Sequence, residues 1–263
     1  MIQPSTYYHI YNHANGFENI FKEEQNYCFF LEKYQFYISP IADTLAYCLM
    51  PNHFHFLIRV KGVEELRTFS PQTFRTLSSP QTFRKLSGLK AKQTFGKLPS
   101  LTSSPQTFQK LSGLKAKQTF SPQTFQKLSV LKTKQTFGKL PLSSLSDTLI
   151  SKQFSKLFSC YTQSFNKYYH RMGSLFIPNF KRKEITSQDY LLQLILYIHN
   201  NPVKHGFTST QADWKFSSFK EIAENKEIFV SKQEVISLFE NLDNFLYAHH
   251  QKENLTNDLM MEE

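Results

Sequence analysis

The chain has 263 residues, long enough for one large domain or two small ones, and its 26 Phe and 13 Tyr supply material for a sizeable core. It has no apolar run long enough to span a membrane, and its first ten residues lack the pattern expected of a signal peptide. Its three cysteines have no paired spacing, so we expect a protein of a reducing cytoplasm more than a membrane or disulfide-rich secreted protein. The net charge of +10 at pH 7 is typical of nucleic-acid-binding proteins, but residues 70–145 carry 13 Lys+Arg and no acid, so most of the excess lies in one segment.

The first predicted elements follow the order β-α-β-β. A strand is predicted at residues 6–12, an amphipathic helix at 24–38, and two strands at 44–50 and 53–60 that a Pro-Asn turn joins. This order matches a split β-α-β unit. We therefore expect an α+β protein with a ferredoxin-like antiparallel sheet and helices on one face of that sheet.

Residues 70–145 are repetitive. The sequence SPQTF occurs four times, at starts that lie 9, 25 and 17 residues apart, and this irregular spacing disfavours a solenoid. Ser, Thr, Gln, Lys and Pro dominate the segment, so we predict a long, basic, low-complexity insertion that is mostly disordered. The alternative is a basic arm that binds DNA phosphates and stacks its Phe rings on bases.

Beyond the insertion, a helix is predicted from about Asp147 and a strand at residues 174–180. A further helix is expected at 188–201, because a Thr-Ser pair can cap its start. It should end before Pro202, since the residue that precedes a proline avoids the helical conformation.

The segment 221–263 is an acidic tail, for which we predict helical structure. A capping box formed by Ser231 and Glu234 indicates the start of one tail helix. The predicted organisation is therefore one folded domain made of residues 1–69 and 146–220, interrupted by the insertion and followed by the tail.

Two histidines stand one residue apart in the predicted strand at 53–60. Residues i and i+2 of a strand point to the same face, so His53 and His55 present their imidazoles side by side. Two adjacent neutral imidazoles are natural ligands of a divalent cation. For so short a pattern, the alternative is a pair of histidines that are satisfied by hydrogen bonds alone.

The predicted helix at 188–201 carries a second candidate group. Tyr197 and Asn201 are four residues apart and share one helix face, where a phenol and an amide oxygen could meet the same metal ion. The alternative is that Tyr197 packs in the core. Tyr190 lies one heptad earlier on the same face and is a rival for any role of Tyr197.

Four basic side chains are candidates for contacts with phosphates. Lys181, Arg182 and Lys183 form a cluster before the helix, and Lys204 lies just past the predicted end of the helix that carries Tyr197. For the cluster, a solvated loop is an equally good interpretation.

Three stretches together resemble a known family. The sequences YCLMPNHFHFLI, GSLFIPNFKRKEI and YIHNNPVKHGF, the last followed by DWKFSSF, resemble the single-tyrosine HUH transposases, and most of all the REP-associated tyrosine transposase group. The resemblance covers about residues 5–69 and 146–220, and the three motifs stand in the family's order.

The resemblance implies a catalytic domain, a reaction and a site. In the family, two histidines and an amide hold a divalent metal, places that His53, His55 and Asn201 occupy here. Mg²⁺ or Mn²⁺ is the implied ion. Tyr197 matches the nucleophile, which would cleave and rejoin single-stranded DNA through a 5′-phosphotyrosine intermediate. The implied partner is single-stranded DNA with hairpin-forming repeat ends, in the cytoplasm of a bacterium.

Two other functions remain open from the sequence. A catalytically silent, domesticated DNA-binding protein could keep the same fold. A metal enzyme unrelated to DNA could use the histidine pair alone. The sequence is compatible with a monomer and with a homodimer.

Overall fold

The computed structural model describes residues 2–68, 142–224 and 229–251. Of the predicted insertion 70–145, only 142–145 lie within these ranges, where they begin a helix; the rest of the insertion and residues 252–263 lie outside the described residues. None of the helices in the described ranges is long and apolar enough to cross a membrane.

Four strands form one antiparallel sheet in the order β2-β3-β1-β4. The strands are β1 (Tyr7–His13), β2 (Ala42–Leu49), β3 (His53–Val60) and β4 (Lys181–Ile185). The helices that connect them are α1 (Glu24–Ile38), α2 (Val63–Thr68) and α7 (Leu142–Tyr168). The connection from β1 to β2 passes over β3, and the connection from β3 to β4 passes over β1.

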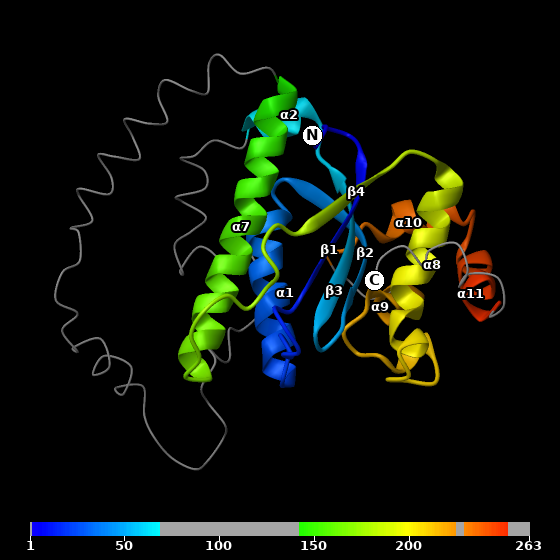
Figure 1. Cartoon of the computed structure of the whole chain (residues 1–263). Helices are drawn as coiled ribbons and strands as arrows, with labels where there is room; N and C mark the ends of the chain where they lie inside the picture. The colour runs from blue at the N-terminus through cyan, green and yellow to red at the C-terminus, as the bar shows by residue number, and fades with distance from the viewer. Residues whose placement is uncertain (1, 69–141, 225–228, 252–263) are drawn as a thin grey trace, which may run out of the picture.

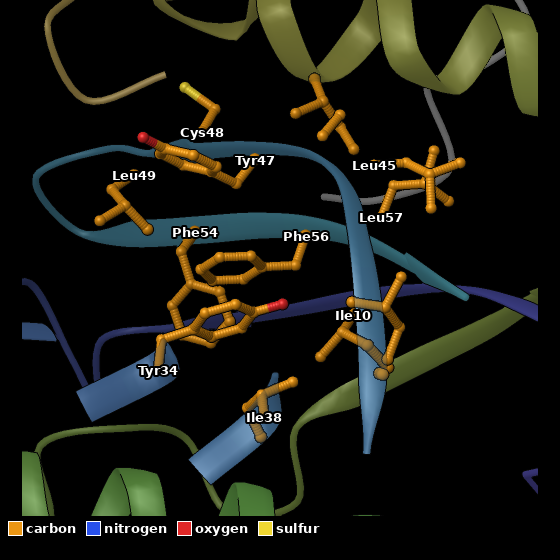
Figure 2. Close-up of a cluster of buried hydrophobic side chains, with 14 of the residues drawn as sticks. Ile10, Tyr34, Ile38, Leu45, Tyr47, Cys48, Leu49, Phe54, Phe56 and Leu57 are labelled. Atoms are coloured by element: carbon orange, nitrogen blue, oxygen red, sulfur yellow. The ribbon is translucent and has the colours of Figure 1, made fainter. Parts of the chain in front are cut away.

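Side-chain alternation along β3 gives the sheet two chemically different sides. Phe54 and Phe56 point to the side that α1 and α7 cover, which we call the aromatic side. There the ring of Tyr34 stacks on Phe56 with centroids 3.9 Å apart, and Phe30 lies 5.4 Å from Phe54. Figure 2 shows Phe54 and Phe56 facing α1, with Leu57 on the other side of the sheet.

The prediction of helices on one face is wrong, because helices cover both faces (Figure 1). The opposite side, which we call the histidine side, is covered by α8 (Gln188–Lys204), the short 3-10 helix Gln211–Asp213, α9 (Ser218–Ala223), α10 (Lys232–Leu238) and α11 (Leu242–His250). The reason lies in the composition of β3. His55 and Leu57 are buried like Phe54 and Phe56, with which they alternate, so this side also needs a cover.

Two local predictions after the insertion are wrong. Residues 174–180 form no strand; the strand is β4, which contains the basic cluster itself. Pro178 cannot donate to a ladder and Asn179 has a φ of 63°, so only an isolated bridge from Phe176 to Ala14 forms. Helix α8 also runs through Pro202 to Lys204, because a proline in the last turn leaves only one carbonyl without its helical partner.

The predicted capping box of the tail is wrong as well. Ser231 precedes α10 but makes no side-chain capping bond. Glu234 instead accepts from the Tyr7 hydroxyl at 2.7 Å and pairs with the Arg59 guanidinium at 3.0 Å. Because Val230 also bridges to Thr44 of β2, the described part of the tail is packed on the sheet.

Candidate functional site

The two predicted ligand histidines lie together in the middle of the sheet. His53 and His55 point to the histidine side of β3, where their exposed fractions are 5% and 2%. Their rings meet edge to face with centroids 5.1 Å apart. A buried pair of imidazoles on a central strand is held rigidly, because strands on both sides fix its backbone.

Helix α8 brings the other two predicted residues to this pair. The Ser187 hydroxyl accepts from the backbone of Tyr190 at 3.3 Å and so caps the start of the helix. One face of α8 then places the Tyr197 ring 5.5 Å from the His55 ring, and the Oδ1 atom of Asn201 lies 3.0 Å from Nε2 of His53. The structure therefore brings all four residues together.

The contacts of His53 fit a cation between it and Asn201. Nδ1 of His53 lies 2.8 Å from the Asn52 side-chain oxygen, so Nδ1 donates and Nε2 keeps a lone pair. That lone pair faces Oδ1 of Asn201, which is also an acceptor, while the Asn201 Nδ2 atom is buried and has no partner among the described residues. A metal ion bound to Nε2 and Oδ1 would satisfy both acceptors; without an ion, the opposite orientation of the amide, with Nδ2 donating to Nε2, would satisfy Nε2 instead.

The donor set is small. In the described ranges, no group of three or more His, Cys, Asp or Glu side chains is placed to hold a metal ion. An ion here would therefore take two imidazole nitrogens and one amide oxygen from the protein, and its remaining ligands from water or a bound phosphate. Such open coordination positions are the rule at metal sites that act on phosphates.

Burial keeps these histidines neutral. Desolvation lowers the pKa of His53 to about 4. Desolvation, and then repulsion from His9, holds the pKa of His55 well below its usual 6.5. Both rings are therefore uncharged at pH 7, which is the state that a metal ligand requires.

The first strand contributes histidines that the sequence analysis missed. In the β1–β3 register, His13 lies opposite His53 and stacks on it with centroids 4.9 Å apart. Nε2 of His9 lies 3.0 Å from Nδ1 of His55. When His55 donates in this bond, its own Nε2 is left with a lone pair for a ligand. His9 and His13 lie four residues apart, in the predicted strand at 6–12 and at its end, so they share one face of it; this spacing in HIYNH is the signal that could have revealed them.

The predicted basic residues separate into two groups. The β1–β4 register places Lys181 and Lys183 on the histidine side, opposite Tyr11 and His9, and Arg182 on the aromatic side. Nζ of Lys204 lies 5.6 Å from the centre of the Tyr197 ring. Three of the four cations thus share a side of the sheet with the histidines.

The rival Tyr190 lies further along α8. Seven residues of helix place it about 10 Å from Tyr197 along the helix axis. Nζ of Lys183 covers its ring at 4.8 Å, and its hydroxyl is buried without a partner among the described residues. Of the two tyrosines, Tyr197 is the one whose ring contacts the histidine pair.

A buried relay joins α8 to the tail. Nδ1 of His249 donates to the Phe245 carbonyl at 2.7 Å, so Nε2 of His249 accepts from Nδ1 of His199 at 2.9 Å. Nε2 of His199 then accepts from the Ser218 hydroxyl at 2.7 Å. Burial lowers the pKa of His249 to about 4 and that of His199 well below 6.5. These neutral contacts hold α8 against α9 and α11 at His199, two residues beyond Tyr197.

Comparisons with known proteins give little. No family model and no curated protein matches the chain. A solved structure described as "Structure of the REP associates tyrosine transposase bound to a REP hairpin" aligns over 87% of this chain and 86% of that chain, with 12% identity and a TM-score of 0.41. A likeness this distant carries no argument on function, which has to be inferred from the side chains.

Proposed function

We propose that this protein is a tyrosine DNA strand transferase that cleaves and rejoins single-stranded DNA. One observation carries the proposal: the Tyr197 ring, the His53–His55 pair and the Asn201 amide oxygen meet at one place on the histidine side. A hydroxyl nucleophile beside a nitrogen–oxygen donor set fits phosphoryl transfer, in which a phosphate ester is positioned and its charge is stabilised.

In the proposed reaction, the Tyr197 hydroxyl releases its proton to solvent and its oxygen forms a bond to a backbone phosphorus. The bond from phosphorus to the 3′ oxygen breaks, and that oxygen leaves as a 3′-OH after it takes up a proton. A 5′-phosphotyrosine remains. Attack by a 3′-OH on this linkage reverses the step and rejoins a strand, so no ATP is consumed.

The surrounding residues have binding roles in this proposal. His53, His55 and Asn201 would hold Mg²⁺ or Mn²⁺, which when bound polarises the scissile phosphate. Lys204 places a positive charge over the Tyr197 ring, where it can attract a phosphate. Lys181 and Lys183 extend the positive charge on the same side.

Three further features belong to the proposal. Single-stranded DNA with hairpin-forming ends is the proposed substrate, as the family resemblance implies. The proposed reaction is compatible with a homodimer. The sheet is proposed to be of the ferredoxin-like class, which the strand order and the two crossovers support.

The test is a search for a covalent adduct. The full chain is incubated with labelled single-stranded DNA from the flanks of its own gene and with Mn²⁺, and the products are separated on a denaturing gel. We expect a band of protein-linked DNA that disappears in Tyr197→Phe and after chelation of the metal. Tyr190→Phe, on the same helix, is the matched control and should retain the band.

Two outcomes would count against the proposal. An adduct that persists in Tyr197→Phe but disappears in Tyr190→Phe would move the nucleophile to the rival tyrosine. Tight binding of many flanking sequences without any adduct would favour the catalytically silent DNA-binding protein.

A further inference from the structure

The edge strand β4 sends basic side chains to both sides of the sheet. Lys181 and Lys183 lie on the histidine side, whereas Arg182 lies on the aromatic side. There Nη1 of Arg182 lies 2.9 Å from the Ser151 hydroxyl and 3.3 Å from the Asp147 carboxylate, both on α7. A polyanion that crosses this edge would meet Lys181 and Lys183 on one side of the sheet and, on the other, the Arg182 guanidinium, whose charge Asp147 partly compensates.

Arg182 also lines a groove on the aromatic side. The groove has a volume of about 650 Å³ and lies between α7 and the loop 174–180. This volume falls in the range of roughly 300–1,000 Å³ that is usual for ligand pockets. Arg182 is its one charged lining residue among those described, and none of them is acidic.

The lining of the groove combines flat apolar rings with neutral hydrogen-bonding groups. The rings of Phe158, Phe176 and Phe180 lie within 5.0 to 5.7 Å of a neighbour in the cluster that they form with Phe154. Hydroxyl and amide groups complete the lining, from Ser155, Ser159, Thr162, Gln163 and Asn179. Flat rings, amides and one guanidinium match a nucleotide, which offers a ring face, a polar edge and a phosphate.

The wall of the groove is hydrogen-bonded to the end of β1, the strand that also carries His13. The backbone N–H of Ile177, in the groove wall, donates to the His13 carbonyl at 3.0 Å, and Asn12 donates from Nδ2 to the Ile177 carbonyl at 3.1 Å. The His13 ring stacks on His53. His13 therefore contacts the groove wall through its backbone carbonyl and the histidine pair through its ring.

We propose that this groove binds one unpaired nucleotide of the single-stranded DNA that passes through the candidate active site, an inference that rests on the proposed function. Arg182 binds its phosphate, the phenylalanine rings contact its base, and the amides and hydroxyls meet the base edge. The strand runs from Lys181 and Lys183 over the edge of β4 into the groove.

The test fills the groove and measures DNA binding. Ser159→Trp and, separately, Gln163→Trp place a large ring in it from exposed positions of α7, so both variants should fold. Ser237→Trp, at an exposed position of α10, is the matched control. The full chains are titrated into fluorescein-labelled single-stranded DNA of mixed sequence in the presence of a chelator, and anisotropy gives the affinity.

We expect both groove variants to bind about tenfold more weakly than wild type, as for the loss of one stacked base, and the control to bind normally. A scan of the DNA with single abasic sites should find one position that weakens wild type but not Ser159→Trp. Equal affinities of groove variants and control, or no binding by wild type, would overturn the inference. The adduct assay with Tyr197 is scored separately. If the adduct forms normally but the groove variants bind DNA as tightly as the control, only the inference about the groove fails and the proposed function stands.

Discussion

The two sides of the sheet are buried to the same depth by different means. On the aromatic side, rings of α1 and α7 pack on Phe54 and Phe56, whose own side chains carry no polar atoms. On the histidine side, His53, His55 and His199 each have a hydrogen-bond partner that fixes the ring. Burying apolar side chains stabilises the fold in proportion to the surface removed from water. Burying a polar group costs free energy unless the group is hydrogen-bonded. The aromatic side therefore supplies stability, and the histidine side holds groups in defined positions for chemistry.

The largest expected loss of stability comes from a substitution on the aromatic side. Phe56→Ala removes a ring that is fully buried and stacked on Tyr34, so the free energy of unfolding should fall by about 3–5 kcal/mol. Urea denaturation followed by circular dichroism measures the loss. Phe17→Ala is the control, because that side chain is fully exposed and its loss should change stability very little. Equal losses in the two variants would contradict the assignment of the core to this side.

The next effect belongs to the histidine side and depends on pH. His249 has a pKa of about 4 in the folded protein and about 6.5 when unfolded, so the unfolded chain binds more protons between these values. The free energy of unfolding should thus fall as pH falls from 7 to 5, by about 2 kcal/mol for this group. His249→Gln lacks the titrating ring and should show a shallower slope. If the free energy of unfolding fell equally with pH in wild type and in His249→Gln, the pKa of His249 would not be lowered in the folded protein.

A smaller effect is expected at His9, the β1 histidine that contacts His55. His9→Phe keeps a ring beside Tyr11 but removes the partner of His55 Nδ1, so Mn²⁺ should bind about 10–100-fold more weakly. Titration calorimetry with Mn²⁺ on the full chain measures this without any turnover. His250→Phe, at an exposed position of α11, is the matched control. Unchanged affinity in His9→Phe would show that His9 does not orient a ligand.

The smallest effect is at the tail. Glu234→Gln removes the charge that pairs with Arg59 but can keep the bond from the Tyr7 hydroxyl, so stability should fall by only about 0.2–1 kcal/mol, and less at high salt. Thermal unfolding at low and high salt measures both parts. A loss of several kcal/mol would mean that the pair is far better shielded from water than its partial exposure indicates.

The sequence predicted the helix at 24–38 and the strand at 53–60 with the bounds that the structure shows, because periodicity and a turn mark both. It also selected His53, His55, Tyr197 and Asn201, which the fold brings together. His9 and His13 were missed because strand pairing, not spacing, places them beside the pair.

Two of the errors have different physical causes. The strand at 174–180 was inferred from apolar residues, but the backbone at Pro178 and Asn179 rules it out. The capping box at Ser231 failed because Glu234 has a distant partner, Arg59, that local pattern does not reveal. In each case a contact from elsewhere in the chain, or a single backbone angle, outweighed the local preference.

The junction between α2 and α7 has a consequence for engineering. The N-terminal segment joins both flanks, since the Ser5 N–H donates to the Val60 carbonyl just before α2, and the Ile2 N–H donates to the Asp147 carboxylate in α7. Both flanks of residues 69–141 are therefore held at one corner of the fold, by the same N-terminal segment. A fluorescent or targeting domain inserted between α2 and α7 would therefore start and end at this corner, and we expect the sheet and its histidines to keep their positions.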